Sequence, residues 1–266
     1  MELIDTHCHL TSEAFAGAVD AVIDRALAVG VRQMITVATD AADARAALAL
    51  TRRRAELRMA AGVHPHETAK AGPGDIEELR RIWSEPLCVA VGEIGLDYHY
   101  DYSPRAIQRD LFARQLEAAR ETPRPIIVHS REAHEDTVAI LRQAGFVNRP
   151  VVFHCFTGTS DEAAQIGEHG WRVSFSGVVT FRKSTELQAI AAACPADRLL
   201  LETDSPYLSP EPVRHLRPNE PAHVAHIARF VAALRGVPAD ELAAQAARNA
   251  RAFFSLPVGT ETGAAD

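Results

Sequence analysis

Two histidines stand one residue apart near the start of the chain, in the stretch "IDTHCHL" at residues 4–10. On a β-strand, residues i and i+2 face the same side, so His7 and His9 would present both imidazoles to one place while Cys8 points away. Paired imidazoles of this kind can bind a metal ion, but a hydrogen-bonded structural pair has the same pattern. The motif alone leaves both interpretations open.

Further imidazoles and carboxylates lie at the ends of other apolar, strand-like runs. Glu93 sits inside "VAVGEIGLD", where a buried carboxylate is unfavourable unless it is paired or binds a metal ion. Three more polar residues fall at or just after the ends of runs: His129 in "PIIVHS", His154 in "VVFHCF" and Asp204 after "RLLLET". Taken singly, a salt bridge, a core histidine or a turn-forming aspartate accounts for each of them.

Taken together, the six residues indicate a metal centre. Without a cation, four imidazoles and two carboxylates in one place would repel one another or lack favourable partners. Both kinds of group are ligands of Zn²⁺, Mn²⁺ and related ions. The set is too large for one tetrahedral ion and fits two ions that share a bridging carboxylate, for which Glu93 is best placed. Neither Lys70 nor Lys183 falls within a strand-like run, which argues against a carbamylated lysine bridge. Mg²⁺, Mn²⁺ and Zn²⁺ all suit these donors.

The elements that must bring these residues together alternate regularly. Amphipathic segments separate apolar runs at residues 3–9, 33–39, 58–64, 88–95, 125–130, 151–156, 172–177 and 198–203. Eight strands, each followed by a helix, predict parallel βαβ units and, at this length, a single (β/α)8 TIM barrel. The active site of such a barrel lies at the carboxyl ends of its strands, where the polar residues fall. An open doubly wound sheet is the alternative, but no glycine-rich phosphate loop follows the first run.

Local signals give some helix ends and the domain limits. Segment 103–120 has helical periodicity, with Ser103 expected as its N-cap and Pro104 as its first helical residue, and segment 130–145 starts at a serine cap. A proline-rich loop and two more helices complete the chain. We predict one barrel domain over residues 1–256 and a flexible C-terminal tail over residues 257–266.

Composition narrows the class of protein. The 266 residues are 47% hydrophobic and carry a net charge of −7, which argues against a protein that coats nucleic acid but allows an enzyme that grips one or two phosphates. Almost all basic residues are arginine, so a phosphate clamp would use guanidinium forks. The four cysteines form no CxxC pair, "MELID" lacks the features of a signal peptide, and no run is long enough to span a membrane. We therefore expect a cytoplasmic protein with reduced thiols and no membrane association.

Seven longer motifs, in order along nearly the whole chain, carry a family resemblance. They are "DTHCHL" (5–10), "GVHPH" (62–66), "GEIGLDY" (92–98), "PIIVHSREA" (125–133), "FHCFTG" (153–158), "ETDSPYL" (202–208) and "PNEPAHV" (218–224). On these motifs the chain closely resembles the TatD-like metal-dependent hydrolases of the amidohydrolase-type barrel superfamily. The resemblance implies a (β/α)8 barrel, divalent metal ions and phosphodiesterase activity, since members are commonly described as deoxyribonucleases that act on DNA ends.

The resemblance also implies roles for individual residues. One ion is expected on His7, His9, Glu93 and Asp204, and the other on Glu93, His129 and His154. His64 and His66 match the motif that lines the substrate side, and Arg131 is placed to meet a phosphate oxygen. The chain departs from the usual pattern on the loop before "NEPA", where it has "VRHLRP" (213–218), and at His223, where tyrosine is common. Those departures concern the choice of substrate.

The expected reaction is hydrolysis of a phosphodiester by a water that two metal ions activate. Glu93 would bridge the ions, Asp204 would take the proton from the water, and Asp97 and Asp5 would orient ligand histidines from behind. The expected substrate is DNA, as a single strand or at DNA ends, and no obligate protein partner is evident from the sequence.

Two other functions stay open at this stage. The same activated water attacks a carbonyl carbon, so a hydrolase of another ester or amide also fits, such as a D-aminoacyl-tRNA deacylase or a small-molecule amidohydrolase. The acidic net charge favours that alternative. A metal-stabilised binding protein without turnover is the third candidate, and the complete set of presumed ligands argues against it.

Overall fold

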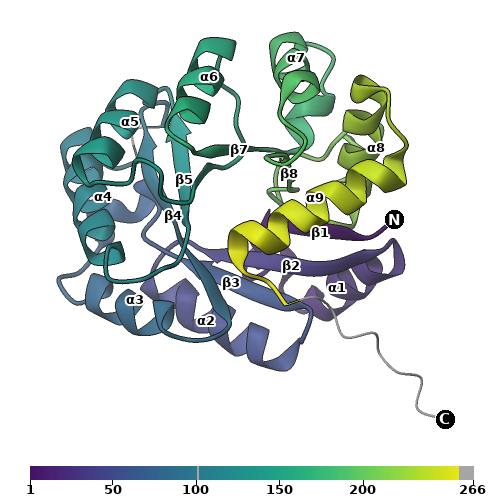
Figure 1. The fold of residues 1–266 in the computed structure, drawn as a ribbon. Helices are drawn as coiled ribbons and strands as arrows, with labels where there is room; N and C mark the ends of the chain where they lie inside the picture. The colour runs from purple at the N-terminus through teal and green to yellow at the C-terminus, as the bar shows by residue number, and fades with distance from the viewer. Residues whose placement is uncertain (101, 258–266) are drawn as a thin grey trace.

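The computed structural model describes residues 1–100 and 102–257 and contains an eight-stranded parallel sheet with the strand order β1 to β8 (Figure 1). The strands are β1 (Leu3–Cys8), β2 (Val31–Ala38), β3 (Leu57–Ala61), β4 (Cys88–Asp97), β5 (Ile126–Arg131), β6 (Val151–Phe153), β7 (Arg172–Phe175) and β8 (Leu200–Leu201). Each predicted strand-like run supplies one of them. The strands are buried almost throughout, as expected of a parallel sheet with both faces covered.

The sheet closes on itself between β1 and the segment that follows β8. Cys8 pairs with Ser205 in a parallel bridge, the amide of His9 donates to the carbonyl of Ser205 (2.7 Å), and the amide of Asp204 donates to the carbonyl of His7 (2.9 Å). All neighbouring strands are parallel, so the carboxyl ends of all strands lie at the same end of the barrel. The predicted (β/α)8 TIM barrel is confirmed.

Helices alternate with the strands and form a ring around the sheet (Figure 1). They are α1 (Val19–Ala28), α2 (Ala41–Arg53), α3 (Asp75–Trp83), α4 (Arg105–Ala119), α5 (His134–Gln143), α6 (Ser160–Glu168), α7 (Thr185–Ala193) and α8 (Val224–Arg235), and α9 (Ala239–Phe254) follows them. Short 3₁₀ turns lie in the loops: η1 (Glu13–Phe15), η2 (Pro65–Lys70), η3 (Gly177–Thr180) and η4 (Pro221–His223).

The helices show the expected sequence signals. Leu79, Ile82 and Trp83 are the buried residues of α3, spaced so that one stripe of the helix faces the sheet. At the start of α6, the Thr159 side chain accepts from the amide of Glu162, whose side chain accepts from the amide of Thr159. This capping box satisfies two backbone donors that the first helical turn leaves without partners.

The start of α4 differs from the prediction. The helix begins after Pro104, and the Ser103 side chain makes no cap. Instead the Ser103 hydroxyl accepts from the amide of Ala69 (3.1 Å) and donates to the carbonyl of His66 (3.0 Å). The Ser103 hydroxyl therefore bonds the backbone of η2 instead of the first amides of α4, and it connects the loop before α4 to η2.

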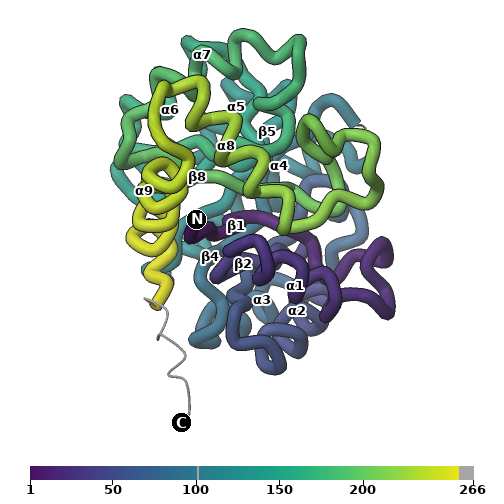
Figure 2. The backbone as a smooth tube through the Cα atoms, turned by 90° about the vertical axis from the view of Figure 1, so that its right-hand side faces the viewer, coloured from purple at the N-terminus to yellow at the C-terminus, as the bar shows by residue number. Residues whose placement is uncertain are grey.

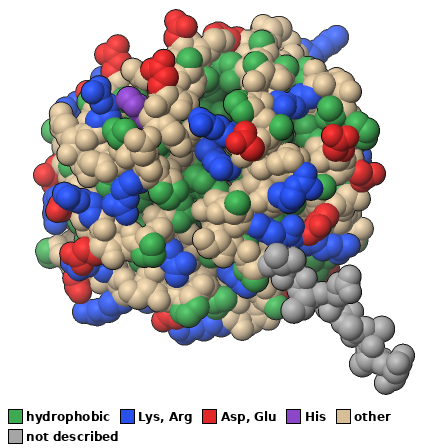
Figure 3. Space-filling view, viewed as in Figure 1, with side chains coloured by type: hydrophobic (Ala, Val, Ile, Leu, Met, Phe, Trp, Pro, Cys, Tyr) green, Lys and Arg blue, Asp and Glu red, His purple; other side chains and the backbone are tan. Residues whose placement is uncertain are grey.

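The amino end of the barrel is closed by α9, which crosses it (Figure 1). Residues of α9 and the segment after it share one buried apolar cluster with strand residues: Ala247, Ala250, Phe253, Phe254 and Leu256 with Ile4, Ile35, Val37, Ala60, Val89, Ala90, Ile127, Val152 and Leu200. Figure 3 shows this face from outside, where acidic and basic side chains are interspersed. The barrel interior is thus packed shut at this end.

The loops at the opposite end carry the polar residues of interest. Figure 2 shows α9 at one end of the barrel and the long loop after β8 at the other. Pro257, the first residue of the expected tail, accepts a hydrogen bond from Gln33 Nε2 (3.2 Å), and residues 258–266 of that tail lie outside the described residues. Within the described ranges, no helix combines the length and the apolar character needed to cross a membrane.

Candidate metal centre

The structure brings all six predicted metal ligands to the carboxyl end of the barrel. They come from separate elements: His7 from β1, His9 from just after it, Glu93 from β4, His129 from β5, His154 from just after β6 and Asp204 from the segment after β8. These residues are far apart in the sequence and meet because parallel strands end on the same side of the sheet.

Glu93 stands at the middle of this group, on a part of β4 that lies very close to β5. Gly92 and Gly95 have φ angles of 142° and 143°. A Cβ would lie 2.5 Å from the Ile127 carbonyl oxygen at Gly92 and 2.0 Å from the His129 carbonyl oxygen at Gly95. Glycine is therefore required at both positions. The close approach holds the Glu93 side chain, which is 2% exposed, among the other ligands.

The two carboxylate oxygens of Glu93 face different partners. Oε2 lies 3.3 Å from His7 Nε2 and 3.9 Å from His9 Nε2. Oε1 lies 2.7 Å from His129 Nδ1 and 2.5 Å from His154 Nε2. One carboxylate thus reaches two pairs of imidazoles with one oxygen each, which is the arrangement that a bridging ligand requires.

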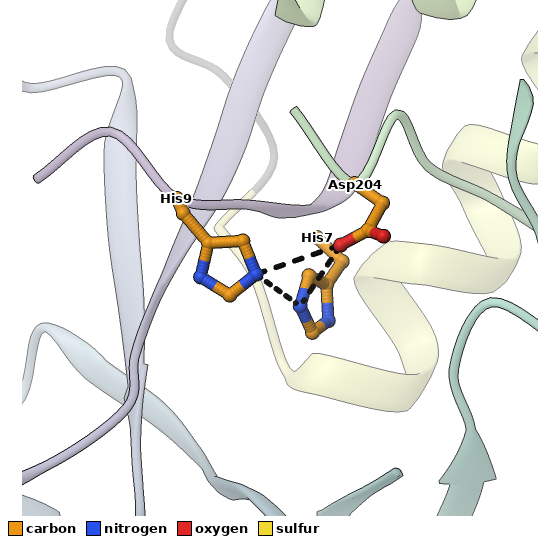
Figure 4. A group of neighbouring side chains, drawn as sticks. All are labelled: His7, His9 and Asp204. Carbon is orange, nitrogen blue, oxygen red and sulfur yellow. Dashed lines mark hydrogen bonds and ion pairs between the residues drawn. The ribbon is translucent and has the colours of Figure 1, made fainter. Parts of the chain in front are cut away.

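His7, His9 and Asp204 form the first group of potential ligands (Figure 4). The Nε2 atoms of His7 and His9 are 3.3 Å apart, and Asp204 Oδ1 lies 3.5 Å from His9 Nε2 and 3.9 Å from His7 Nε2. His9 Nδ1 lies 2.9 Å from the carbonyl oxygen of Val37. A carbonyl only accepts, so Nδ1 carries a proton, and Nε2 is the nitrogen that faces His7 and Asp204.

A second group lies on the other side of Glu93. His64 Nε2 is 3.3 Å from Glu93 Oε1 and 3.4 Å from His129 Nδ1. His154 Nε2 is also 3.4 Å from His129 Nδ1, and its ring stacks on His7 with the centroids 4.0 Å apart. The sequence motif indicated that His64 faces the substrate. In the structure it is 9% exposed and directed at the ligands.

Asp97 holds two imidazoles through one oxygen. Its Oδ2 accepts from His129 Nε2 (3.0 Å) and from His66 Nε2 (2.9 Å), and its Oδ1 accepts from the amide of Tyr100 (2.8 Å). Burial raises the pKa of a carboxyl, but the hydrogen bonds from His129 and His66 outweigh it and lower the pKa of Asp97. An ionised carboxylate in this place orients the ring of His129 from behind.

Asp5 contacts the backbone rather than an imidazole. Its Oδ1 accepts from the amides of His7 (3.3 Å) and Thr203 (2.9 Å), and its Oδ2 lies 2.5 Å from the Thr203 hydroxyl. Burial raises the pKa of Asp5 to about 8. Asp5 therefore joins β1 to the segment after β8 and fixes the seam on which His7 and Asp204 stand.

Two of the predicted substrate-contacting residues lie at the rim. His66 is in η2, and its side chain is 24% exposed. Arg131 is the last residue of β5 and is exposed, with its Cζ 4.7 Å from the ring centre of Tyr100. Both side chains can reach a ligand that enters from solvent.

Glu202 is a buried carboxylate that was not among the functional residues predicted from the sequence. Its Oε1 accepts from the amide of Cys155 (2.5 Å) and lies 3.4 Å from His154 Nδ1, and its Oε2 accepts from the Ser174 hydroxyl (2.7 Å). A signal was present in the sequence, because Glu202 ends an apolar run just as Glu93 lies inside one. The structure places Glu202 directly behind His154.

The imidazoles around Glu93 differ in charge. Burial lowers the pKa of His7, and burial lowers the pKa of His64 to about 4, so both rings are neutral near pH 7. Burial also opposes the protonation of His129 and His154, but the adjacent carboxylates outweigh it and raise the pKa of each. Burial opposes ionisation of Glu93, yet the surrounding imidazoles lower its pKa well below the usual range.

The donor set fits divalent cations. Nε2 atoms of two histidines approach each other at 3.3 Å while both face carboxylate oxygens, an arrangement that a cation between them reconciles. The donor atoms form three groups, and within each group they lie within 4.8 Å of one another: His7, His9 and Asp204; His7, His154 and Glu202; and His64, Glu93 and His129. Neutral imidazoles and ionised carboxylates are the ligands that Zn²⁺ and Mn²⁺ prefer.

Known proteins resemble this chain in sequence and in fold. The family model described as "TatD related DNase" matches residues 4–255. Over 259 residues the chain is 39% identical to "Uncharacterized metal-dependent hydrolase YcfH" of Escherichia coli K12. The alignment covers 96% of this chain and 97% of that protein. Over 259 residues it is 40% identical to "3'-5' ssDNA/RNA exonuclease TatD" of Erwinia amylovora, which covers 96% of this chain and 100% of that protein.

Solved structures agree with these matches. The crystal structure of YjjV, a TatD homologue from Escherichia coli K12, matches with a TM-score of 0.90 at 32% identity, covering 96% of this chain and 98% of that one. A TatD family hydrolase from Entamoeba histolytica has the same fold, with a TM-score of 0.87 at 24% identity and coverage of 96% and 98%. Family model, relatives and fold together show that the chain belongs to the TatD-related DNase family of metal-dependent hydrolases.

Proposed function

We propose that the protein is a metal-dependent exonuclease that removes nucleotides from the 3′ end of single-stranded DNA or RNA. Its relative in Erwinia amylovora, 40% identical, is named for 3′–5′ exonuclease activity on ssDNA and RNA. The observation that carries the proposal is Glu93, whose two oxygens face separate pairs of imidazoles. A shared carboxylate of this kind suits two ions that clamp the attacking and leaving oxygens of a phosphodiester.

The proposed ligands divide between two ions. The first would be held by His7, His9, Glu93 and Asp204, and the second would be held by Glu93, His129 and His154. His64 offers a further neutral nitrogen to the second ion, since its Nε2 is 3.3 Å from Glu93 Oε1. Mg²⁺, Mn²⁺ and Zn²⁺ are the candidate metals, and the assay below identifies the one that supports turnover.

When bound, the two ions supply positive charge to the phosphate oxygens and lower the pKa of the attacking water. Asp204 would take the proton from that water. Burial opposes its ionisation, but the bond to His9 outweighs this and lowers the pKa of Asp204, so the side chain is a carboxylate at neutral pH. Its side chain is 13% exposed, compared with 2% for Glu93, and therefore lies on the open side of the centre.

The rim supplies the proposed phosphate contacts. Arg131 presents an exposed guanidinium, and His66 presents a ring held by Asp97. The loops after β7 and β8 add exposed cations: Arg182, Lys183, Arg214 and Arg217. Residues 176–184 and 205–219 contain one acid, Glu211. This arc of the mouth is therefore basic, although the whole chain carries a net charge of −7.

A reducing compartment suits the cysteines. Cys8, Cys88, Cys155 and Cys194 are all free, and burial raises the pKa of the Cys8 and Cys155 thiols well above the usual value. Free, protonated thiols are usual where glutathione keeps cysteine reduced. This supports the cytoplasm as the proposed location.

A product ladder tests the proposed activity. Metal-depleted protein is mixed with a 5′-labelled single-stranded oligonucleotide and with Mg²⁺, Mn²⁺ or Zn²⁺ in turn. We expect the label to appear in products that shorten from the 3′ end, and a chelator to stop the reaction. Parallel reactions contain a D-aminoacyl-tRNA and a simple lactone, since an activated water also attacks carbonyl carbon.

The matched variants separate the site from the scaffold. The double variant Glu93→Ala, His129→Ala should lose cleavage and keep its circular dichroism spectrum. Glu168→Ala, which removes an exposed carboxylate at the end of α6, should cleave like the wild type. Wild-type turnover in the double variant at saturating metal, or faster hydrolysis of a carbonyl substrate than of any oligonucleotide, would overturn the proposal.

A further inference from the structure

Exposed aromatic rings gather around the mouth of the metal centre. Tyr100, Tyr102 and Tyr207 are 38%, 66% and 57% exposed, and they are the aromatic members of the large exposed hydrophobic side chains in the described part of the chain. Tyr100 and Tyr102 follow β4, and Tyr207 follows β8. Large rings left in water at the end of the barrel that carries the ligands point to a partner with flat apolar faces.

The rings of Tyr100 and Tyr102 are already arranged as a stack. Their centroids are 5.3 Å apart and their planes differ by 6°. The ring of His66 meets Tyr102 nearly at right angles, with the centroids 4.8 Å apart, and the Arg131 guanidinium lies over Tyr100 at 4.7 Å. Tyr102, the more exposed of the two, presents the open end of this stack.

Tyr207 stands across the mouth from this pair. Its amide donates to the carbonyl of Asp204 (2.9 Å), its carbonyl accepts from Asn219 Nδ2 (2.5 Å), and its ring lies 6.0 Å from that of His9. In an eight-stranded barrel, β4 and β8 are on opposite sides. The Tyr100–Tyr102 pair and Tyr207 therefore flank the metal ligands.

We propose that the Tyr100–Tyr102 pair and Tyr207 are two platforms on which nucleobases of the substrate stack, one on each side of the phosphate to be cleaved. The inference rests on the proposed exonuclease function and adds to it the recognition of the base. Every nucleobase has a π-face, so such stacking grips the strand without reading its sequence. The basic loops after β7 and β8 lie beside Tyr207, where they can follow the phosphates of the same strand.

The test compares two substrates for each protein. One is a labelled single-stranded oligonucleotide, and the other has the same length with abasic tetrahydrofuran units at its 3′ end. The measured quantity is the ratio of kcat/KM for the two substrates. The wild type should prefer the base-bearing strand, and the double variant Tyr100→Ala, Tyr102→Ala should lower that ratio at least about fivefold, the smallest loss expected for one stacked base. Tyr207→Ala should lower it independently.

Controls keep the outcomes distinct. Tyr100→Phe, Tyr102→Phe retains both rings and should retain the ratio, as should Val147→Ala, which shortens an exposed apolar side chain before β6 at the other end of the barrel. If the double alanine variant does not fold, Tyr102→Ala alone replaces it. An unchanged ratio in the alanine variants overturns the platforms while leaving the exonuclease standing, whereas wild-type protein that cleaves neither strand with any of the three metals overturns the proposed function itself.

Discussion

The two ends of the barrel are built from the same strands and have opposite chemistry. At the amino end, inward-facing Ile127, Val152 and Leu200 pack against α9. Two residues further along the same strands or just beyond them, the side chains are His129, His154 and Glu202. Because residues i and i+2 share a face, a step of two residues along each strand leads from the buried apolar cluster to the candidate metal centre.

The difference separates the sources of stability and of chemistry. The apolar cluster at the amino end stabilises the barrel by burial, whereas the buried carboxylates and imidazoles at the carboxyl end carry a desolvation cost that bound metal ions would offset. Changes at one end should therefore alter activity with little effect on folding, and changes at the other should do the reverse.

The largest effect is expected at Glu93. Glu93→Gln keeps the volume of the side chain but removes the charge that both groups of imidazoles face. We expect turnover to fall about a thousandfold or more, because the variant loses the one charge that both groups of imidazoles share. Steady-state kinetics and metal content by mass spectrometry check this. A variant that keeps its full metal content and turnover would contradict the bridging role.

The converse change is Phe254→Ala in α9, which truncates a side chain that is 1% exposed. We expect a loss of about 3–5 kcal/mol in the free energy of unfolding, measured with urea, and unchanged turnover per folded molecule. Metal at a hundred times its Kd should stabilise this variant and the wild type alike, by about 2.7 kcal/mol for each bound ion, and should stabilise Glu93→Gln less. If metal raised the free energy of unfolding of both variants equally, the proposed division between a stabilising amino end and a metal-binding carboxyl end would be wrong.

A smaller effect is expected at Glu202, which lies behind a ligand and not among the atoms nearest Glu93. Glu202→Gln retains an oxygen for the amide of Cys155 but no longer presents a charge to His154 Nδ1. We expect metal affinity to fall about 10- to 100-fold, measured by competition with a chromogenic chelator. Ser174→Ala, which removes only the hydroxyl bonded to Glu202, should have the lesser effect of the two. Unchanged affinity in Glu202→Gln would show that its charge does not support His154.

The smallest effect is expected in the ring of helices, which belongs to neither end. The bond from Arg109, with that from Tyr98, lowers the pKa of Asp136. Because the folded state lowers this pKa, the ionised Asp136 stabilises the protein at pH values above the ordinary pKa of 3.8. The stabilisation is lost as the pH falls through the pKa of the folded state. Solvent screens this exposed pair, so Asp136→Asn should cost less than about 1 kcal/mol at pH 7 and nothing at low pH. The free energy of unfolding, measured with urea at several pH values, checks this expectation. A loss larger than about 1 kcal/mol would show that the ring of helices contributes to stability as the apolar cluster at the amino end does.

The sequence was sufficient to predict the fold and the convergence of the six predicted ligands, because both follow from topology. Once parallel strands alternate with helices, residues at the ends of strands must share one end of the barrel. His129 and Asp204 meet Glu93 and His9 there although no local signal connects them. The same topology explains why the expected strand-like runs and the observed strands coincide in number and order.

Contacts between distant segments limited the finer predictions. The α5 helix starts at His134 rather than at Ser130, which remains on β5 with its hydroxyl 3.1 Å from that of Thr137. The last strand is shorter than expected, because Asp5 bonds the amide of Thr203 and Asp204 turns away with a φ of 56°. Propensity describes what a residue does alone, and each of these residues has a partner that the local sequence does not show.

The hydrogen bonds between Asp5 and Thr203 join residues that are 198 positions apart in the chain. The ligands beside them, His7 and Asp204, are separated almost as widely, so the first group of donors is completed only when the eighth strand has left the ribosome. A nascent chain, or one cut short before Thr203, lacks the residue that seats Asp204 against His7. The second group of donors, His64, Glu93 and His129, lies wholly within the first half of the chain. A chain cut short before Asp204 would therefore lack the first proposed ion site and the proposed base, while it would still carry the residues proposed for the other ion.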